Sequence, residues 1–121
     1  MNQPDLLQKW EIEFKKGFSK PIILLTLVDK ANYPYNLARE INENTEGQIS
    51  IVVSNLYPIL KDLADEGLIE KRKEAKPSKT SDKSPQFRTV YSMTSKGEEF
   101  LVSLKTSLEE FIEVLIKHLE K

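Results

Sequence analysis

The sequence predicts a mainly α-helical fold with one small β-hairpin and a long helix at the end. Apolar residues recur at steps of three and four along several segments, which is the spacing of one face of a helix. Two shorter segments alternate between apolar and polar residues and flank a stretch without apolar residues, as the strands and loop of a hairpin do. The 121 residues are enough for one domain with a modest core.

The first predicted helix covers residues 5–16 and is amphipathic. Its apolar face is formed by Leu7, Trp10 and Phe14. This face could pack on its own domain or on a partner subunit, and the spacing favours neither.

A second helix is predicted from Ser19, its expected N-cap, to Ala31, with Pro21 in the first turn. Residues 21–28 are apolar on nearly all sides, which is typical of the buried centre of a small domain. The stretch Asn-Tyr-Pro at 32–34 ends this helix.

Two further helices are predicted around a turn at residues 45–48. The first covers 35–44, and the second runs from 50 to 66 and stops at Gly67. The inner stripe of the second comprises Val52, Leu56, Ile59 and Leu63, supported by Leu60 and Ala64. Its outward residues are Ser54, Pro58, Lys61, Asp62 and Asp65. Because Pro58 removes a backbone hydrogen bond, we expect a local distortion or a helix that starts near Val52.

The hairpin is predicted to pair strands 68–74 and 88–93 across a loop at 76–86. Thr94 is the expected N-cap of a last helix that continues to Lys121. Apolar residues follow this helix in a stripe that approximates a heptad: Leu101, Leu104, Leu108, Phe111 or Ile112, Leu115 and Leu119. A chain of this length has little left to cover such a stripe, so we expect it to pair with a second copy.

Charge is concentrated in one segment of an otherwise nearly neutral chain. The formal net charge is −1, whereas residues 69–88 hold seven basic and three acidic side chains, a local charge of +4. A basic hairpin beside an exposed helix can contact the phosphates of DNA.

The order of these elements, helix, helix, turn, helix and basic hairpin, is that of a winged helix-turn-helix. In such folds the helix after the turn enters the major groove, roughly 12 Å wide, and the preceding helix braces it. We therefore expect the helix at 50–66 and the hairpin to bind double-stranded DNA. The predicted contacts are Ser54, Asn55, Tyr57, Lys61, Lys71, Arg72, Lys73, Lys76 and Arg88.

Residues 54–63 read Ser-Asn-Leu-Tyr-Pro-Ile-Leu-Lys-Asp-Leu and are followed by Glu-Gly-Leu-Ile at 66–69. This run resembles the recognition helix of PadR-type transcriptional regulators, which carry a Leu-Tyr-Pro step. Residues 88–97, with Arg88, Tyr91 and Gly97, are similar to that family's second wing strand and its entry into the last helix. The Tyr-Pro-Tyr step at 33–35 stands where the family has a Tyr-Gly-Tyr-like step, so Pro34 replaces a glycine.

The resemblance covers roughly residues 19–101 and implies a dimer that represses transcription until a small-molecule effector releases it. Ser54 also departs from the family, which commonly has glycine there, and the wing loop is long; these departures bear on base preference and wing geometry. Residues 1–18 would then form a dimer contact, 19–94 the winged helix-turn-helix domain and 95–121 the dimerisation helix. The expected interface comprises Leu7, Trp10, Phe14, Leu101, Leu104, Leu108, Phe111, Ile112, Leu115 and Leu119.

The residues also indicate which classes of protein to set aside. There are no cysteines and one histidine, His118, and no phosphate-binding loop or metal-ligand spacing occurs. We therefore expect no enzyme activity, cofactor, metal or membrane span, and the lack of cysteine fits a cytoplasmic protein. The alternative to a DNA-binding regulator is a winged-helix adaptor that binds proteins, because the net charge is near zero and acidic residues follow Lys61.

Overall fold

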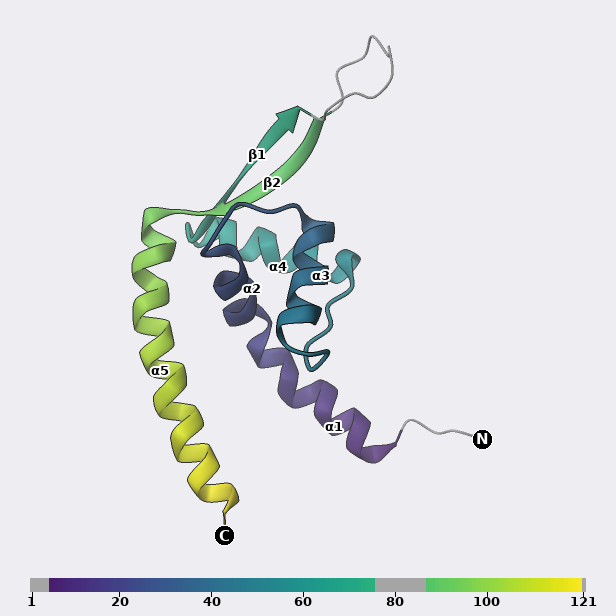
Figure 1. The fold of residues 1–121 in the computed structure, drawn as a ribbon, viewed down its shortest axis with the longest axis vertical. Coiled ribbons are helices and arrows are strands. Elements are labelled where there is room, and N and C mark those ends of the chain that lie inside the picture. Colours follow the sequence, from purple (N-terminus) through teal and green to yellow (C-terminus); the bar gives the residue numbers. More distant parts are fainter. Residues whose placement is uncertain (1–4, 76–86, 121) are drawn as a thin grey trace.

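The computed structural model describes residues 5–75 and 87–120, and the elements follow the predicted order. These are α1 (Leu6–Lys15), η1 (Lys16–Phe18), α2 (Ser19–Leu27), α3 (Pro34–Asn44), α4 (Val53–Asp65), β1 (Ile69–Ala75), β2 (Phe87–Met93) and α5 (Ser95–Leu119). In Figure 1 the hairpin projects from one end of the molecule, α5 runs from the base of the hairpin toward the opposite end, and α1 extends toward that end as well. A winged helix-turn-helix with a long last helix is therefore confirmed. The loop predicted at 76–86 lies outside the described residues.

Helices α1 and α2 are joined by the turn η1 without an extended residue between them. The prediction of Ser19 as an N-cap is therefore wrong, because its backbone is helical (φ −60°, ψ −52°) and it is the first residue of α2. Helix α2 also ends at Leu27 rather than at Ala31. Soon after, the backbone of Asn32 pairs with that of Tyr91 through hydrogen bonds of 2.9 and 2.8 Å, and this pairing requires an extended chain.

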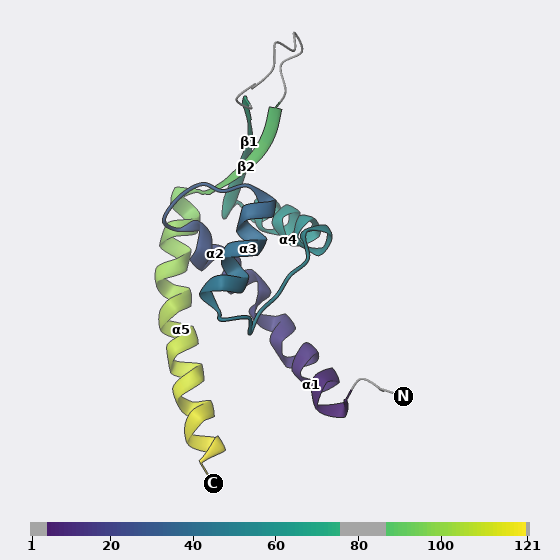
Figure 2. The ribbon, with the colours of Figure 1, turned by 45° about the vertical axis from the view of Figure 1, so that its right-hand side comes forward.

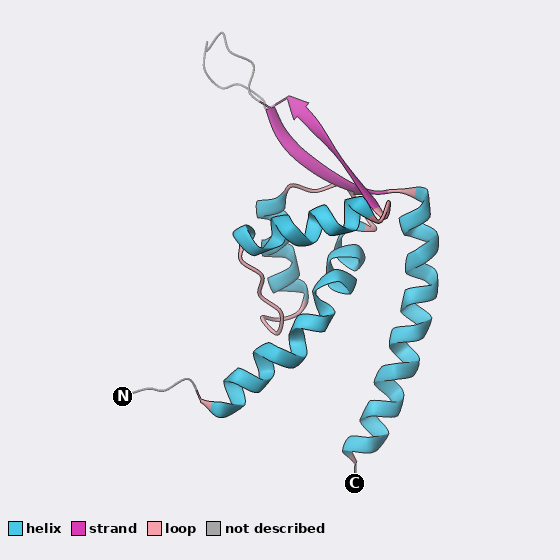
Figure 3. Cartoon of the chain, turned by 180° about the vertical axis from the view of Figure 1, so that it is seen from behind, coloured by secondary structure: helices cyan, strands magenta, loops and turns pink. Residues whose placement is uncertain are grey.

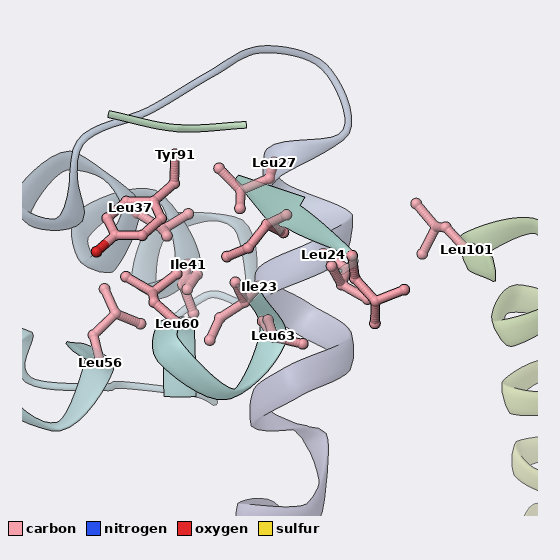
Figure 4. Packing of buried hydrophobic residues seen from close by; sticks show 12 residues of the cluster. Ile23, Leu24, Leu27, Leu37, Ile41, Leu56, Leu60, Leu63, Tyr91 and Leu101 are labelled. Atoms are coloured by element: carbon pink, nitrogen blue, oxygen red, sulfur yellow. The ribbon is translucent and has the colours of Figure 1, made fainter. Parts of the chain in front are cut away.

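The core lies where α2, α3 and α4 pack together, and Figure 4 shows its side chains meeting there. Its buried members are Ile23, Leu24, Leu27, Leu37, Ile41, Leu56, Leu60, Leu63, Leu68, Ile69, Tyr91 and Leu101. Ile23, Leu24 and Leu27 belong to the run predicted as the buried centre, and Leu56, Leu60 and Leu63 to the inner stripe predicted for the helix at 50–66. Val52 is the exception: it is 59% exposed because it is the extended N-cap of α4, where helical spacing no longer applies.

Helix α4 starts and stops close to where its proline and glycine residues predict. It begins at Val53, close to the start that Pro58 implied, and Pro58 lies in its interior. It stops at Gly67, which has a left-handed backbone (φ +80°). The Leu68 N–H donates to the Leu63 carbonyl at 3.0 Å and the Gly67 N–H donates to the Ala64 carbonyl at 2.9 Å. These are the two hydrogen bonds of a Schellman motif, and they turn the chain directly into β1.

Strands β1 and β2 form an antiparallel hairpin, with Ile69 opposite Met93 at the base and Ala75 opposite Phe87 at the outer end. The strand bounds lie within one residue of those predicted. Helix α5 starts at the predicted cap, because the Gly97 N–H donates to the Thr94 hydroxyl at 3.0 Å. Figures 2 and 3 show that the distal part of α5 stands away from the core. None of the helices described is long and apolar enough to cross a membrane.

The start of α5 lies in close contact with the backbone that follows α4. A Cβ atom at Gly97 would stand 2.0 Å from the Leu68 carbonyl oxygen, so no side chain fits there. Gly17 is the matched control, because its Cβ position has no neighbour within 4 Å among the described residues.

We predict that Gly97→Ala lowers the free energy of unfolding by about 3 kcal/mol or more, since the clash is with backbone. Gly17→Ala should be neutral or stabilising by up to about 1 kcal/mol, because alanine restricts the unfolded chain. Urea unfolding of both variants measures the difference. Equal stabilities for the two variants would contradict the close contact.

Candidate nucleic-acid interface

The exposed face of α4 carries the side chains predicted to contact DNA. Ser54, Asn55, Tyr57 and Lys61 are all exposed. By helical spacing, Ser54 and Lys61 share the centre of this face, while Tyr57 lies at the edge nearer the hairpin and Asn55 at the opposite edge. Ser54, Tyr57 and Lys61 therefore form one continuous surface, and Asn55 lies at its border.

The N-terminus of α4 has no side-chain cap among the described residues. The Val52 carbonyl accepts the N–H groups of Asn55 and Leu56 at 2.9 and 3.2 Å. The N–H groups of Val53 and Ser54 precede these two and have no acceptor within the helix, and such groups attract anions. The beginning of α4 therefore suits a phosphate or the edge of a base.

The C-terminal half of α4 is acidic, and one of its carboxylates pairs with Lys61 of the same helix. The Lys61 ammonium donates to Asp65 at 2.9 Å, and this hydrogen bond and the charge of Asp65 raise the pKa of Lys61. Lys20 of α2 is paired with Glu66 at 3.0 Å. Lys61 thus remains charged at neutral pH, but the carboxylate beside it offsets its charge.

The three basic residues of β1 do not share a face. In the hairpin Lys71 is opposite Tyr91 and Lys73 is opposite Thr89, so these two lysines lie on the Tyr91 side. Arg72 lies on the other side. Tyr91 is buried in the same cluster as Leu56 and Leu60 of α4, which places this side of the hairpin next to α4. Burial, and secondly the neighbouring Tyr57 phenol, raise the pKa of Tyr91. Lys71 and Lys73 are therefore the exposed cations on the side nearer to Tyr57.

Two other predicted wing contacts have different outcomes. Lys76 lies outside the described residues. Arg88 is half-buried, with its guanidinium carbon 3.8 Å from the centre of the Tyr33 ring. Arg88 thus stacks on Tyr33 of its own chain, and it is not the free surface cation that the sequence predicted.

Helix α3 adds two exposed residues that were not predicted. Tyr35 is 74% exposed in the first turn, and the exposed Arg39 follows one turn later. Together with Val52 and Val53 of the α4 start they line a shallow hollow of about 350 Å³. The one signal in the sequence is Tyr35, an aromatic residue at the start of a short helix and part of the Tyr-Pro-Tyr step.

A larger hollow of about 610 Å³ separates α1 from the start of α4. Ile12 and Lys15 line it from α1, and Asn55 and Ile59 line it from α4. Lys15 crosses this region to donate a hydrogen bond to Gln48 at 3.0 Å. Asn55 therefore faces this hollow as well as the border of the exposed surface.

The residues predicted for a dimer interface differ in how far their own chain buries them. Leu101 is 2% exposed and belongs to the core of its own chain, and Leu104 packs partly against that core. The heptad spacing could not separate these residues from the rest of the stripe, because the start of α5 packs on α2. Leu108 is half-buried. The exposed members are Leu7, Trp10, Phe14, Phe111, Ile112, Leu115 and Leu119.

Comparison with known proteins gives the fold a family. Residues 23–103 match the family model described as "Transcriptional regulator PadR-like family". The chain belongs to the PadR-like family of transcriptional regulators. This membership agrees with the predictions of a regulator and of a protein that is not an enzyme. Comparison with curated proteins gives no match.

Solved PadR structures share this architecture. A PadR family regulator from Eggerthella lenta is 21% identical with a TM-score of 0.79, over 97% of this chain and 95% of that one. A PadR-like regulator from Bacillus cereus is 25% identical with a TM-score of 0.73, over 90% and 98%. Bacillus subtilis PadR, solved with operator DNA, is 27% identical with a TM-score of 0.59, over 70% of this chain and 45% of that one.

The buried Tyr91 phenol gives a test of the contact between α4 and the hairpin. In the unfolded chain its pKa is the ordinary 10.0, and in the folded chain the pKa is higher. Above about pH 10 the unfolded state therefore loses a proton that the folded state keeps, so the free energy of unfolding falls as pH rises.

We predict that Tyr91→Phe makes this alkaline fall shallower, because the variant has no phenol to ionise on unfolding. Denaturant unfolding between about pH 9 and pH 11 measures the slope. Tyr35→Phe, at an exposed tyrosine, should keep the slope of the wild type. A Tyr91→Phe slope equal to the wild-type slope would show that this phenol is not held in a buried site.

Proposed function

We propose that the chain is a dimeric, sequence-specific repressor that binds double-stranded DNA. The observation that carries the proposal is the surface formed by the uncapped start of α4, with Ser54 and Tyr57, next to Lys71 and Lys73 of β1. It combines groups that read base edges with cations that contact phosphates. A related protein, Bacillus subtilis PadR, has been solved with operator DNA, which supports this assignment.

The charges on α4 define how the helix meets the duplex. Asp62, Asp65 and Glu66 are exposed at its C-terminal end and would repel phosphates. The N-terminal half therefore enters the major groove, with Ser54 and Tyr57 nearest the bases. Tyr35 and Arg39 of α3 flank the same helix start and would meet the adjacent DNA backbone.

The lysines of β1 supply the affinity that does not depend on sequence. Lys71 and Lys73 lie on the side of the hairpin next to α4, so they reach phosphates that flank the groove. Lys61 contributes less, because its ammonium is shared with Asp65.

The second copy in the proposed dimer covers apolar side chains that one chain leaves exposed. On α1 these include Trp10 and Phe14, and on α5 they include Ile112 and Leu115. An exposed apolar surface on two helices is typical of an interface with another protein. In a symmetric dimer, the two α4 helices would meet half-sites about one helical turn, roughly 34–36 Å, apart.

Release by a small-molecule effector is part of the same proposal. The hollow between α1 and α4 joins the helix proposed for dimerisation to the helix proposed for DNA contact. A molecule bound there would touch Ile12 on one side and Ile59 on the other. It could therefore change the position of α4 relative to the partner subunit.

DNA binding is tested with a duplex selected from genomic fragments by the full chain. We predict that its binding constant falls steeply with salt, and that Lys73→Ala reduces the slope of log K against log salt by about 0.9 for each phosphate that the lysine neutralises. Lys105→Ala, at an exposed cation on α5, should leave the slope unchanged. Titration at several salt concentrations measures both.

The DNA-binding proposal fails if no fragment is enriched and all duplexes bind as weakly as bulk DNA. In that case a stable protein partner captured without DNA would favour the winged-helix adaptor.

Dimerisation is tested by sedimentation of the full chain. We predict a species of twice the 14.0 kDa chain mass at micromolar concentration. Leu115→Asp should convert it to monomer, because the substitution places a charge on the apolar stripe. Ser103→Asp, on an exposed polar position of α5, is the matched control and should remain dimeric. A monomeric wild type would contradict the proposed interface.

A further inference from the structure

We propose that Arg88 is a positioning residue that fixes the angle of the hairpin relative to α4, and that it does not bind DNA phosphates. The inference rests on the proposed DNA-binding function for its effect on affinity. The clamp itself, formed by Arg88, Tyr33 and Glu74, is visible in the free chain.

The clamp brings both strands of the hairpin onto one aromatic ring. The Arg88 guanidinium of β2 stacks over the Tyr33 ring, 3.8 Å from its centre. The Tyr33 hydroxyl donates a hydrogen bond to Glu74 of β1 at 3.0 Å. Arg88 and Glu74 are opposite one another in the hairpin, so their side chains leave it on the same side.

Tyr33 is itself held firmly by the helical body. It is the N-cap of α3, and its N–H donates to the Asn32 side chain at 2.9 Å. Asn32 is buried, and its amide group donates to Glu40 of α3, which also pairs with Lys30 at 3.3 Å. The backbone that carries the Tyr33 ring is therefore held to the start of α3.

The position of the clamp along the hairpin explains what it controls. The backbone bridge between Asn32 and Tyr91 attaches β2 near its base. The pair of Glu74 and Arg88 lies almost at the outer end, with one described pair beyond it. Attachment at two separate points fixes the direction of a hairpin, whereas attachment at the base alone leaves it free to swing.

The chemistry of the contact favours arginine over lysine. A planar guanidinium can stack on a ring over its whole face, and an ammonium cannot. The Arg88 Nε atom is buried and has no hydrogen-bond partner within the described part of the chain. One face of the group is thus covered by the ring and the Nε donor is withdrawn from solvent, so Arg88 is held against Tyr33. Lys71 and Lys73 lie on the opposite side of the hairpin, and their position relative to α4 depends on the hairpin direction.

The test compares Arg88→Lys with Tyr33→Leu in the full chain. A phosphate contact by Arg88 would not be weakened by Tyr33→Leu, because this substitution removes no charge. In Arg88→Lys such a contact would keep its charge and lose at most one of its hydrogen bonds. The clamp predicts that each variant weakens binding to the selected duplex by about tenfold, the scale of a cation–π contact. It also predicts that the double variant is no weaker than either single variant, because both remove the same contact.

A second measurement needs no DNA. In the free wild-type protein, the Arg88 side-chain protons should be shifted upfield in the NMR spectrum by the Tyr33 ring. Tyr33→Phe should keep that shift, since the ring remains, while Tyr33→Leu should abolish it. Thermal unfolding confirms that each variant is folded.

The binding and NMR measurements distinguish failure of the clamp from failure of the proposed DNA-binding function. If Arg88→Lys binds the duplex as tightly as the wild type does, the positioning role is overturned. The same holds if the Arg88 protons of the wild type show no upfield shift. If the wild type shows the shift but binds no duplex, the proposed function fails while the clamp stands.

Discussion

The arrangement of the molecule depends on one close contact between backbones, where the Leu68 carbonyl oxygen lies against Gly97. Three hydrogen bonds lock this joint: the Thr94 N–H donates to Leu68 at 3.1 Å, the Thr94 hydroxyl donates to Gly67 at 2.7 Å, and the Lys96 ammonium donates to Glu66 at 2.8 Å. The end of α4 and the start of α5 are thereby held in a fixed relation. In the proposed dimer, this joint transmits the geometry of the subunit contact to the helix that meets DNA.

The charges that bear on DNA binding are concentrated on the hairpin and on α4. A net charge of −1 predicts little attraction to DNA, and the described hairpin strands are only moderately basic. What matters is placement: Lys71 and Lys73 lie on the side of the hairpin next to α4, and the acidic side chains are gathered at the far end of that helix. The N-terminal half of α4 therefore attracts the phosphates of DNA and the C-terminal half repels them. This order determines which end of the helix faces the duplex in the proposed complex.

Much of this fold could be predicted from the sequence, because apolar spacing and glycine placement are local signals. The buried faces of α2, α3 and α4 and the stop at Gly67 follow from such signals. The errors come from backbone continuity and tertiary contacts that apolar spacing does not show. Ser19 is not a cap because α1 continues into α2, and Leu101 is a core residue because α5 packs on α2. The sequence could not show that Arg88 stacks on Tyr33, since the two residues are distant along the chain.

An amide NMR titration of the full chain with its selected duplex is the sharpest test of the proposed DNA-binding surface. We predict that the largest shift changes fall on residues 53–61 and on Lys71 and Lys73, and that the distal part of α5 is unaffected. Changes centred on α1 or on the acidic end of α4 would contradict the proposal, because a different surface would then meet the DNA.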